Sequence, residues 1–243
     1  MRKINVITMA GSGQRFLDQK YLTPKPLIII KKKPMFYYAA KSLPLSQNFI
    51  FICQKKLNLI YKFKLFVKKF FNNSKIIEIP KKTNGQATTC KLASKYLRND
   101  DIVTYGSCDY FYSFNRKQFD QLINSNDLVL FVHKPQKINI VNFKEYGWVK
   151  KGKENTIQKI KCKNKVSQNP KNDFVIAGTF TFKNKKIFHH SYREMINKID
   201  KINNEFYMDT VAKHAVLLKY KVKYIMVKNF KSYGTPGELK KNV

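Results

Sequence analysis

Residues 6–28, VITMAGSGQRFLDQKYLTPKPLI, combine a glycine loop with two cations directly after an apolar run. Gly11 and Gly13 leave the main chain free to approach a ligand, and the backbone N–H groups of such a loop can point at an anion. The guanidinium of Arg15 could bind two phosphate oxygens, and Lys25, held between two prolines, could add a point charge. These residue types at this spacing predict a phosphate-binding site.

Two familiar phosphate loops are excluded. The chain has no G-x-x-x-x-G-K-[ST] sequence, so it is not a P-loop NTPase, and the loop lacks the third glycine of a dinucleotide fingerprint. A G-x-G pair after a strand is equally typical of a tight turn. The interpretation therefore depends on residues elsewhere in the chain.

Carboxylates are scarce, with 15 Asp and Glu against 48 Lys and Arg, so the position of each one is informative. Asp109, in DIVTYGSCDYF, could bind a Mg²⁺ that bridges nucleotide phosphates, or it could cap a turn. Glu205 and Asp209, in NNEFYMDTV, would share one face if this segment is helical. The alternative for that pair is two solvated helix acids.

The elements that would position these residues alternate through the first half of the chain. Apolar runs predict strands at 4–9, 49–53, 75–79 and 101–105, and amphipathic segments predict helices at 34–43, 57–71 and 86–97. Such alternation is typical of an α/β fold with a mainly parallel sheet, whose strand ends carry the ligand site. We therefore expect the loops at 10–16 and 106–112 to meet at one edge of the sheet.

The second half has a looser pattern. Shorter strands are predicted at 127–133, 147–151, 156–162, 174–182 and 223–227, with two helices before the last of them. No linker or repeat separates the halves, so we expect a single domain over residues 1–243.

The formal charge of +33 would ordinarily indicate nucleic acid, an anionic membrane surface or a polyanionic substrate. The lysines are spread along the whole chain, however, and no nucleic-acid recognition motif is present, so we expect no nucleic-acid partner. The helix predicted at 57–71 interleaves lysine with phenylalanine, which also suits a membrane surface. Its apolar residues fall on one stripe, which we expect to pack on the sheet instead: Leu59, Phe63, Phe66 and Phe70.

The apolar runs and the cysteines indicate the cellular compartment of the protein. No apolar run is long enough to span a membrane, and the segment at 4–10 is too short for a secretion signal. Four cysteines, at positions 53, 90, 108 and 162, form no C-x-x-C pair and predict reduced core thiols. We expect a cytoplasmic protein.

The wider pattern resembles a known family. M-A-G-S-G-Q-R-F followed by T-P-K-P-L-I is similar to the opening signature of the nucleotidyltransferases that make nucleotide-sugars, the sugar-nucleotide pyrophosphorylase family. The resemblance implies a Rossmann-like three-layer α/β/α sandwich of the GT-A-like type, with an NTP-binding half at 1–125 and an acceptor-binding half at 126–243. It assigns the NTP phosphates to the opening loop and its cations, namely Ala10, Gly11, Ser12, Gly13, Arg15 and Lys25.

Other segments resemble further parts of the same family. SCDYF and NNEFYMDTV imply that Asp109 and Asp209 hold the metal, and TNGQATT implies that Gly85 and Gln86 read the nucleobase. The acceptor side would comprise Gly178, Glu205 and Tyr110. Relatives carry a glutamate-lysine pair here, but this chain reads KIKCKNKVSQNP, so Lys161, Lys163 and Lys165 compete to bind the acceptor phosphate, and the register favours Lys163. YGTPGEL resembles the family's closing turn, which implies a structural role and no catalytic one.

The resemblance implies transfer of NMP from an NTP, with CTP or UTP favoured, to a phosphorylated acceptor, with Mg²⁺ and release of pyrophosphate. A sugar 1-phosphate is the first choice of acceptor, for a bacterial surface polysaccharide, and a non-sugar phosphomonoester such as phosphocholine is the alternative. A choline head would need nearby carboxylates, which are scarce, or an aromatic cage, for which the candidate rings are Tyr110, Tyr112, Tyr146 and Trp148. The rivals from other classes are a glycosyltransferase, although no D-x-D is present near Asp109, and a basic nucleic-acid-binding protein. A homo-oligomer stays open.

Overall fold

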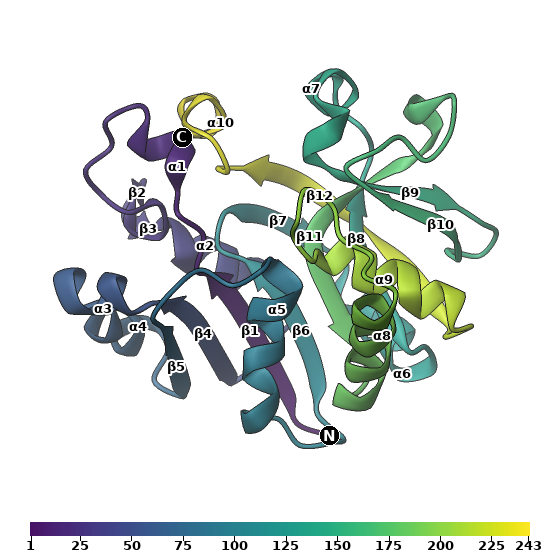
Figure 1. Cartoon of the computed structure of the whole chain (residues 1–243), viewed down its shortest axis with the longest axis horizontal. Helices are drawn as coiled ribbons and strands as arrows, with labels where there is room; N and C mark the ends of the chain where they lie inside the picture. Colours follow the sequence, from purple (N-terminus) through teal and green to yellow (C-terminus); the bar gives the residue numbers. More distant parts are fainter.

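The computed structural model describes residues 1–243, which form a three-layer α/β/α sandwich around a ten-stranded mixed sheet (Figure 1). The strands of this sheet are β1 (Lys3–Met9), β4 (Asn48–Gln54), β5 (Ser74–Ile79), β6 (Ile102–Ser107), β7 (Tyr110–Phe114), β8 (Leu128–His133), β9 (Gly147–Lys151), β10 (Ile157–Cys162), β11 (Phe174–Phe182) and β12 (Val222–Ser232). A separate two-stranded sheet consists of β2 (Ile29–Ile30) and β3 (Lys33–Pro34).

The helices are α1 (Gln14–Leu17), α2 (Met35–Ser42), α3 (Lys55–Tyr61), α4 (Phe63–Phe70), α5 (Gln86–Lys91), α6 (Arg116–Ser125), α7 (Lys137–Val141), α8 (Lys185–Asn197), α9 (Met208–Leu217) and α10 (Pro236–Asn242). Short 3₁₀ helices are η1 (Lys25–Leu27), η2 (Leu92–Tyr96), η3 (Phe143–Glu145) and η4 (Pro170–Asn172).

The strand order is β5-β4-β1-β6-β11-β8-β12-β7, with β9 paired to β11 and β10 paired to β9. Strand β1 pairs in parallel with β4 and β6, and β4 with β5, as the alternation in the first half predicts. Strand β11 runs antiparallel to both of its main neighbours, β6 and β8. The sheet is therefore parallel where the glycine loop leaves it and mixed beyond.

Both faces of the sheet are covered, which is why its strands are apolar on both sides. In β1, Val6 packs in the large cluster under α5, α8 and α9, and Ile7 packs in the cluster under α2, α3 and α4. Figure 1 shows α5, α8 and α9 lying in front of the sheet. The three-layer fold expected from the sequence is confirmed.

The single helix expected at 57–71 is wrong. The chain turns at Lys62, which has a φ of 49°, so that α3 and α4 are separate helices. This break lets Leu57 of α3 and Val67 of α4 join the same buried cluster. Leu59 and Phe66 of the expected stripe remain exposed, at 68% and 41%.

The cysteines are all free, and Cys53, Cys90 and Cys108 are buried as expected. Cys162 is half-buried, so it is not a core thiol. Burial raises the pKa of the Cys53 and Cys108 thiols to about 12, which leaves them protonated at neutral pH. No helix combines the length and the apolar run that crossing a bilayer requires.

Candidate active site

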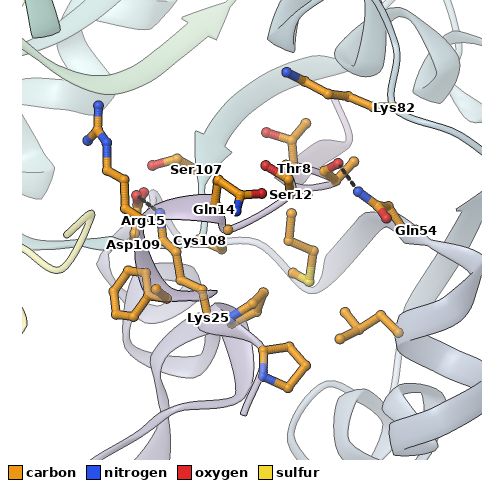
Figure 2. Close-up of a pocket in the computed structure, with 18 of the residues that line it drawn as sticks. Thr8, Ser12, Gln14, Arg15, Lys25, Gln54, Lys82, Ser107, Cys108 and Asp109 are labelled. Carbon is orange, nitrogen blue, oxygen red and sulfur yellow. Dashed lines mark hydrogen bonds and ion pairs between the residues drawn. The ribbon is translucent and has the colours of Figure 1, made fainter. Parts of the chain in front are cut away.

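A cavity of about 580 Å³ opens where β1 and β6 end (Figure 2). Because Thr8 of β1 pairs with Ser107 of β6, the loops that follow the two strands meet there, as the sequence predicts. The second loop is shorter than expected, since β7 begins at Tyr110 and leaves only Cys108 and Asp109 between the strands. The cavity brings together ten of the expected site residues, Ala10, Gly11, Ser12, Gly13, Arg15, Lys25, Gly85, Gln86, Asp109 and Glu205.

The glycine loop lies along one wall of the cavity. Gly13 has a φ of 68° at the start of α1, a conformation that glycine adopts without strain. The Gln54 amide of β4 donates to the Ala10 carbonyl at 2.8 Å and holds the loop against the sheet. Arg15 is half exposed at the rim, with its guanidinium 3.4 Å from the Glu145 carboxylate. The loop is thus fixed, and the arginine stays accessible to a ligand.

Lys25 and Asp109 form the central ion pair of the cavity. The Lys25 ammonium lies 2.5 Å from Asp109 Oδ2, and the two side chains are only 19% and 13% exposed. Burial opposes both charges, but their mutual attraction outweighs it, so the pKa of Lys25 is raised and the pKa of Asp109 is lowered. Asp109 is therefore ionised at neutral pH, with a lysine as its counter-charge.

The turn at 234–236 supports this pair from outside. The Tyr233 backbone N–H donates to the Asp109 carbonyl at 2.8 Å. A Cβ on Gly234 would lie 3.3 Å from Asp109 Oδ2, so the turn packs closely against the carboxylate. This contact fits the structural role expected of the closing turn.

Glu205 and Asp209 do not share a helix face, so that expectation is wrong. Glu205 lies before α9, pairs with Lys82 at 2.5 Å and accepts from the Tyr207 hydroxyl at 2.8 Å. Asp209 lies in the first turn of α9 and is not among the residues that line the cavity.

Asp209 is instead half-buried and lies against the main chain of Gly147, where any Cβ would overlap its carboxylate. Burial raises the pKa of Asp209 to about 6, although the Cys162 thiol and the Lys163 charge favour the ionised form. Tyr110 is close enough to both Asp109 and Asp209 for each carboxylate to add to the rise in its pKa that burial causes. The two expected metal ligands thus flank one tyrosine, and only Asp109 lines the cavity.

On the expected acceptor side, Gly178 lies in an irregular part of β11 with a φ of 64°, and a Cβ there would overlap the Tyr110 ring. The tyrosine therefore packs on the glycine, although neither residue lines the cavity. The Lys163 ammonium lies 5.1 Å from the ring of Tyr207, which does line it. Lys165 instead lies over Phe143.

Two of the four rings proposed for a cationic acceptor are unsuitable. Trp148 is fully buried and donates to the Phe143 carbonyl, and Tyr112 is 3% exposed and donates to Thr179. Neither ring can face a ligand. This arrangement disfavours a caged choline head.

The loop expected to read the base packs against the segment before α9. Gly85 has a φ of 114°, and a Cβ there would overlap the main chain of Phe206. The Gln86 amide lies 3.5 Å from the Thr8 hydroxyl, at the end of β1.

Sequence reasoning missed several cavity residues, among them Thr8, Gln54, Lys82, Thr83, Ser107 and Tyr207. Thr8 and Ser107 could have been found, because they are the polar residues that end neighbouring parallel strands. Lys82 could not have been found, because nothing in the sequence distinguishes it from the many other lysines of the chain.

No group of three or more His, Cys, Asp or Glu side chains is arranged to hold a metal by itself. Mg²⁺ needs no such group, since proteins commonly bind it through one or two carboxylates together with substrate phosphates. Asp109 is an ionised carboxylate beside a phosphate-binding loop, so the residues present fit Mg²⁺ bound with a nucleotide.

The family described as nucleotidyl transferase matches residues 4–228. A nucleoside-diphosphate-sugar pyrophosphorylase from Vibrio cholerae RC9 superposes with a TM-score of 0.80 at 19% identity, over 98% of each chain. An inositol-1-phosphate CTP transferase from T. maritima gives 0.73 at 17% identity, over 100% of this chain and 96% of that one. A UTP-bound UGPase from Acinetobacter baumannii gives 0.74 at 15% identity, over 100% and 92%. At these identities the structures share the fold, and no curated protein matches the sequence.

Proposed function

This chain belongs to the nucleotidyl transferase family and is a nucleotidyltransferase, and we propose that it transfers NMP from an NTP to a small phosphorylated acceptor with release of pyrophosphate. One observation carries the proposal. The glycine loop, Arg15 and Lys25 share a cavity with the ionised carboxylate of Asp109.

The half at 1–125 binds the NTP. The N–H groups of the loop at 11–13 and the guanidinium of Arg15 bind phosphate oxygens, and Gly85 and Gln86 contact the base. Lys25 exchanges its contact with Asp109 for a contact with the phosphates, so its charge follows the ligand. CTP or UTP is the favoured donor, which the CTP transferase and the UTP-bound UGPase among the similar structures support.

Asp109 and Asp209 would hold Mg²⁺, which would supply positive charge to offset that of the α-phosphate. The side chains position two anions against their mutual repulsion, which Arg15 and Lys25 reduce. A phosphate monoester is already anionic at neutral pH and needs no general base. In agreement, no histidine lines the cavity.

The half at 126–243 binds the acceptor through Lys163, Gly178, Glu205 and Tyr110. Lys163 lies beside Tyr207, which lines the cavity, and lowers the pKa of Asp209. These two contacts support a role for its charge in binding the acceptor phosphate. A sugar 1-phosphate is the favoured acceptor, with a non-sugar phosphomonoester as the alternative. The product would serve a bacterial surface polysaccharide, made in the cytoplasm, where buried free thiols such as Cys90 persist.

The test is pyrophosphate release with Mg²⁺, for CTP, UTP, GTP, ATP and dTTP against a panel of sugar 1-phosphates and phosphorylated alcohols. We expect release that needs one NTP and one acceptor. Asp109→Ala abolishes it, whereas Asp120→Ala, which removes a half-exposed carboxylate outside the cavity, does not. No release with any pair, together with no NTP-dependent rise in melting temperature, overturns the proposal.

A further inference from the structure

The corner between α3 and α4 exposes apolar side chains that the fold does not use. Leu59 and Ile60 of α3 are 68% and 67% exposed, and Leu65 and Phe66 of α4 are 66% and 41% exposed. Leu22, 91% exposed, lies beside them, since its carbonyl accepts from the Tyr61 hydroxyl. We call these five side chains, Leu22, Leu59, Ile60, Leu65 and Phe66, the α3–α4 face.

Lysines share the two helices with this face. Six exposed lysines lie in the same two helices and the turn between them, namely Lys55, Lys56, Lys62, Lys64, Lys68 and Lys69. Residues 55–71 include no carboxylate, and no ion pair of the structure involves any of the six lysines. The face is therefore an apolar patch in two helices whose lysines have no ion-pair partner, although the Lys68 ammonium donates to the Asn72 and Ser74 carbonyls.

We propose that the α3–α4 face binds the surface of an anionic phospholipid bilayer. Soluble monomers rarely expose grouped apolar side chains without an interaction to match. Short helices with Leu, Ile or Phe on one face and lysines beside them place the apolar side chains among the lipid headgroups and the ammonium groups on the lipid phosphates. The turn at Lys62 divides the segment into two helices, and each of them leaves a pair of apolar side chains exposed.

Two other occupants suit the face less well. A second copy of the chain in a two-fold contact would bring the same lysines of both copies together without carboxylates between them. A nucleic acid would use the lysines but leave the aliphatic side chains of Leu59, Ile60 and Leu65 without a role, since base stacking needs aromatic rings. A bilayer uses both the lysines and the apolar side chains.

The face adjoins the cavity. Leu22, Ile60 and Tyr61 line the cavity opening as well as lying on or beside the face. A chain bound in this way would hold its cavity next to the lipid surface, where a released product is at once available to a membrane-bound enzyme.

The test is co-sedimentation of the full chain with vesicles of equal parts phosphatidylglycerol and phosphatidylcholine, and with vesicles of phosphatidylcholine alone. We expect binding to the first only. Leu59→Glu with Leu65→Glu, both outside the cavity, lowers the partition coefficient by at least about tenfold. The control is Ile199→Glu with Leu217→Glu, which makes the same charge change at exposed apolar residues just after α8 and at the end of α9. It lowers the partition coefficient by no more than about twofold. In Figure 1 these helices lie on the other side of the molecule from α3 and α4.

Three results overturn the proposal. One is an equal loss of binding in both double variants, which would mean that net charge alone drives it. Another is unchanged binding in Leu59→Glu with Leu65→Glu. The third is a vesicle-free dimer that this variant dissociates, which would make a second copy the occupant. Unfolding midpoints within about 2 °C of the parent show that the variants fold, since exposed substitutions rarely cost more than about 0.5 kcal/mol.

Discussion

Replacing Lys25 by methionine is the most informative single change, because it removes the counter-charge of a buried carboxylate and keeps the length of the side chain. Asp109 is 13% exposed, and Lys25 is its only ion-pair partner. In the variant, burial still opposes the charge of Asp109, but the Lys25 charge, which is the largest influence against burial, is gone. We expect Lys25→Met to destabilise the fold as well as abolish activity.

Two considerations set the expected loss in the free energy of unfolding. Removing one partner of a buried ion pair costs about 3–5 kcal/mol. Relative to a chain that lacks both charges, the cost cannot exceed that of protonating the carboxyl, which at pH 7 is about 4 kcal/mol for an ordinary pKa of 3.8. Because both side chains keep some contact with solvent, we expect about 3 kcal/mol, or about 6–12 °C in Tm for a chain of this length.

The assay is urea unfolding of Lys25→Met, Asp109→Asn and the double variant at pH 7. The double variant has no buried charge, so it is expected to recover about 2 kcal/mol relative to Lys25→Met while remaining inactive. Lys56→Met removes an exposed lysine at the same cavity that has no carboxylate partner, and should cost less than about 0.5 kcal/mol.

The effect of Lys25→Met on stability should also depend on pH. The pKa of Asp109 is lowered in the fold, so its stabilising contribution is present above its ordinary pKa of 3.8 and is lost as the pH falls through the lowered value. The difference between parent and Lys25→Met should therefore shrink in acid. A Lys25→Met variant as stable as the parent at pH 7, or a double variant no more stable than Lys25→Met, refutes the reasoning.

Three further predictions concern the second half of the chain. The pKa of Asp209 is raised to about 6, so the stability that this carboxyl confers is present below pH 4 and lost as the pH rises through 6. In metal-free buffer, the free energy of unfolding of Asp209→Asn should therefore rise relative to that of the parent by up to about 3 kcal/mol between pH 4 and pH 8. A difference that stays constant with pH in urea titrations contradicts this. Gly178→Ala forces a positive φ on alanine and a Cβ into the Tyr110 ring, so it should cost about 2 kcal/mol in the same assay, and an unchanged midpoint argues against the packing. In steady-state kinetics, Lys163→Ala should raise the KM for the acceptor by about tenfold or more, and Lys165→Ala by less than about twofold. A larger rise in Lys165→Ala than in Lys163→Ala would mean that Lys165 binds the acceptor phosphate.

Much of the first half could be predicted because its physics is local. Strands buried on both faces are continuous apolar runs, as at 49–53, and Pro34 marks the residue before α2. The meeting of the glycine loop with Asp109 also followed from sequence, since parallel neighbours end at the same edge.

What could not be predicted depends on contacts between distant segments. The turn at Lys62 is set by how α3 and α4 reach the same cluster, and the sequence periodicity gives no sign of it. Asp209 lies over Gly147, a residue far away in sequence, so nothing near Asp209 predicts its burial or its raised pKa. A carboxylate placed on a helix face by spacing alone can therefore be misassigned.

The central claim is that an acceptor phosphate takes the NMP group of an NTP. Phosphorus NMR of the complete reaction, with the pair that releases pyrophosphate, tests it most directly. The account predicts that the signals of the NTP and of the acceptor monoester give way to one pair of coupled diphosphate signals and to pyrophosphate, in equal amounts. Formation of free NMP or inorganic phosphate with the acceptor monoester unchanged, or turnover of a nucleotide-sugar without any NTP, would contradict it.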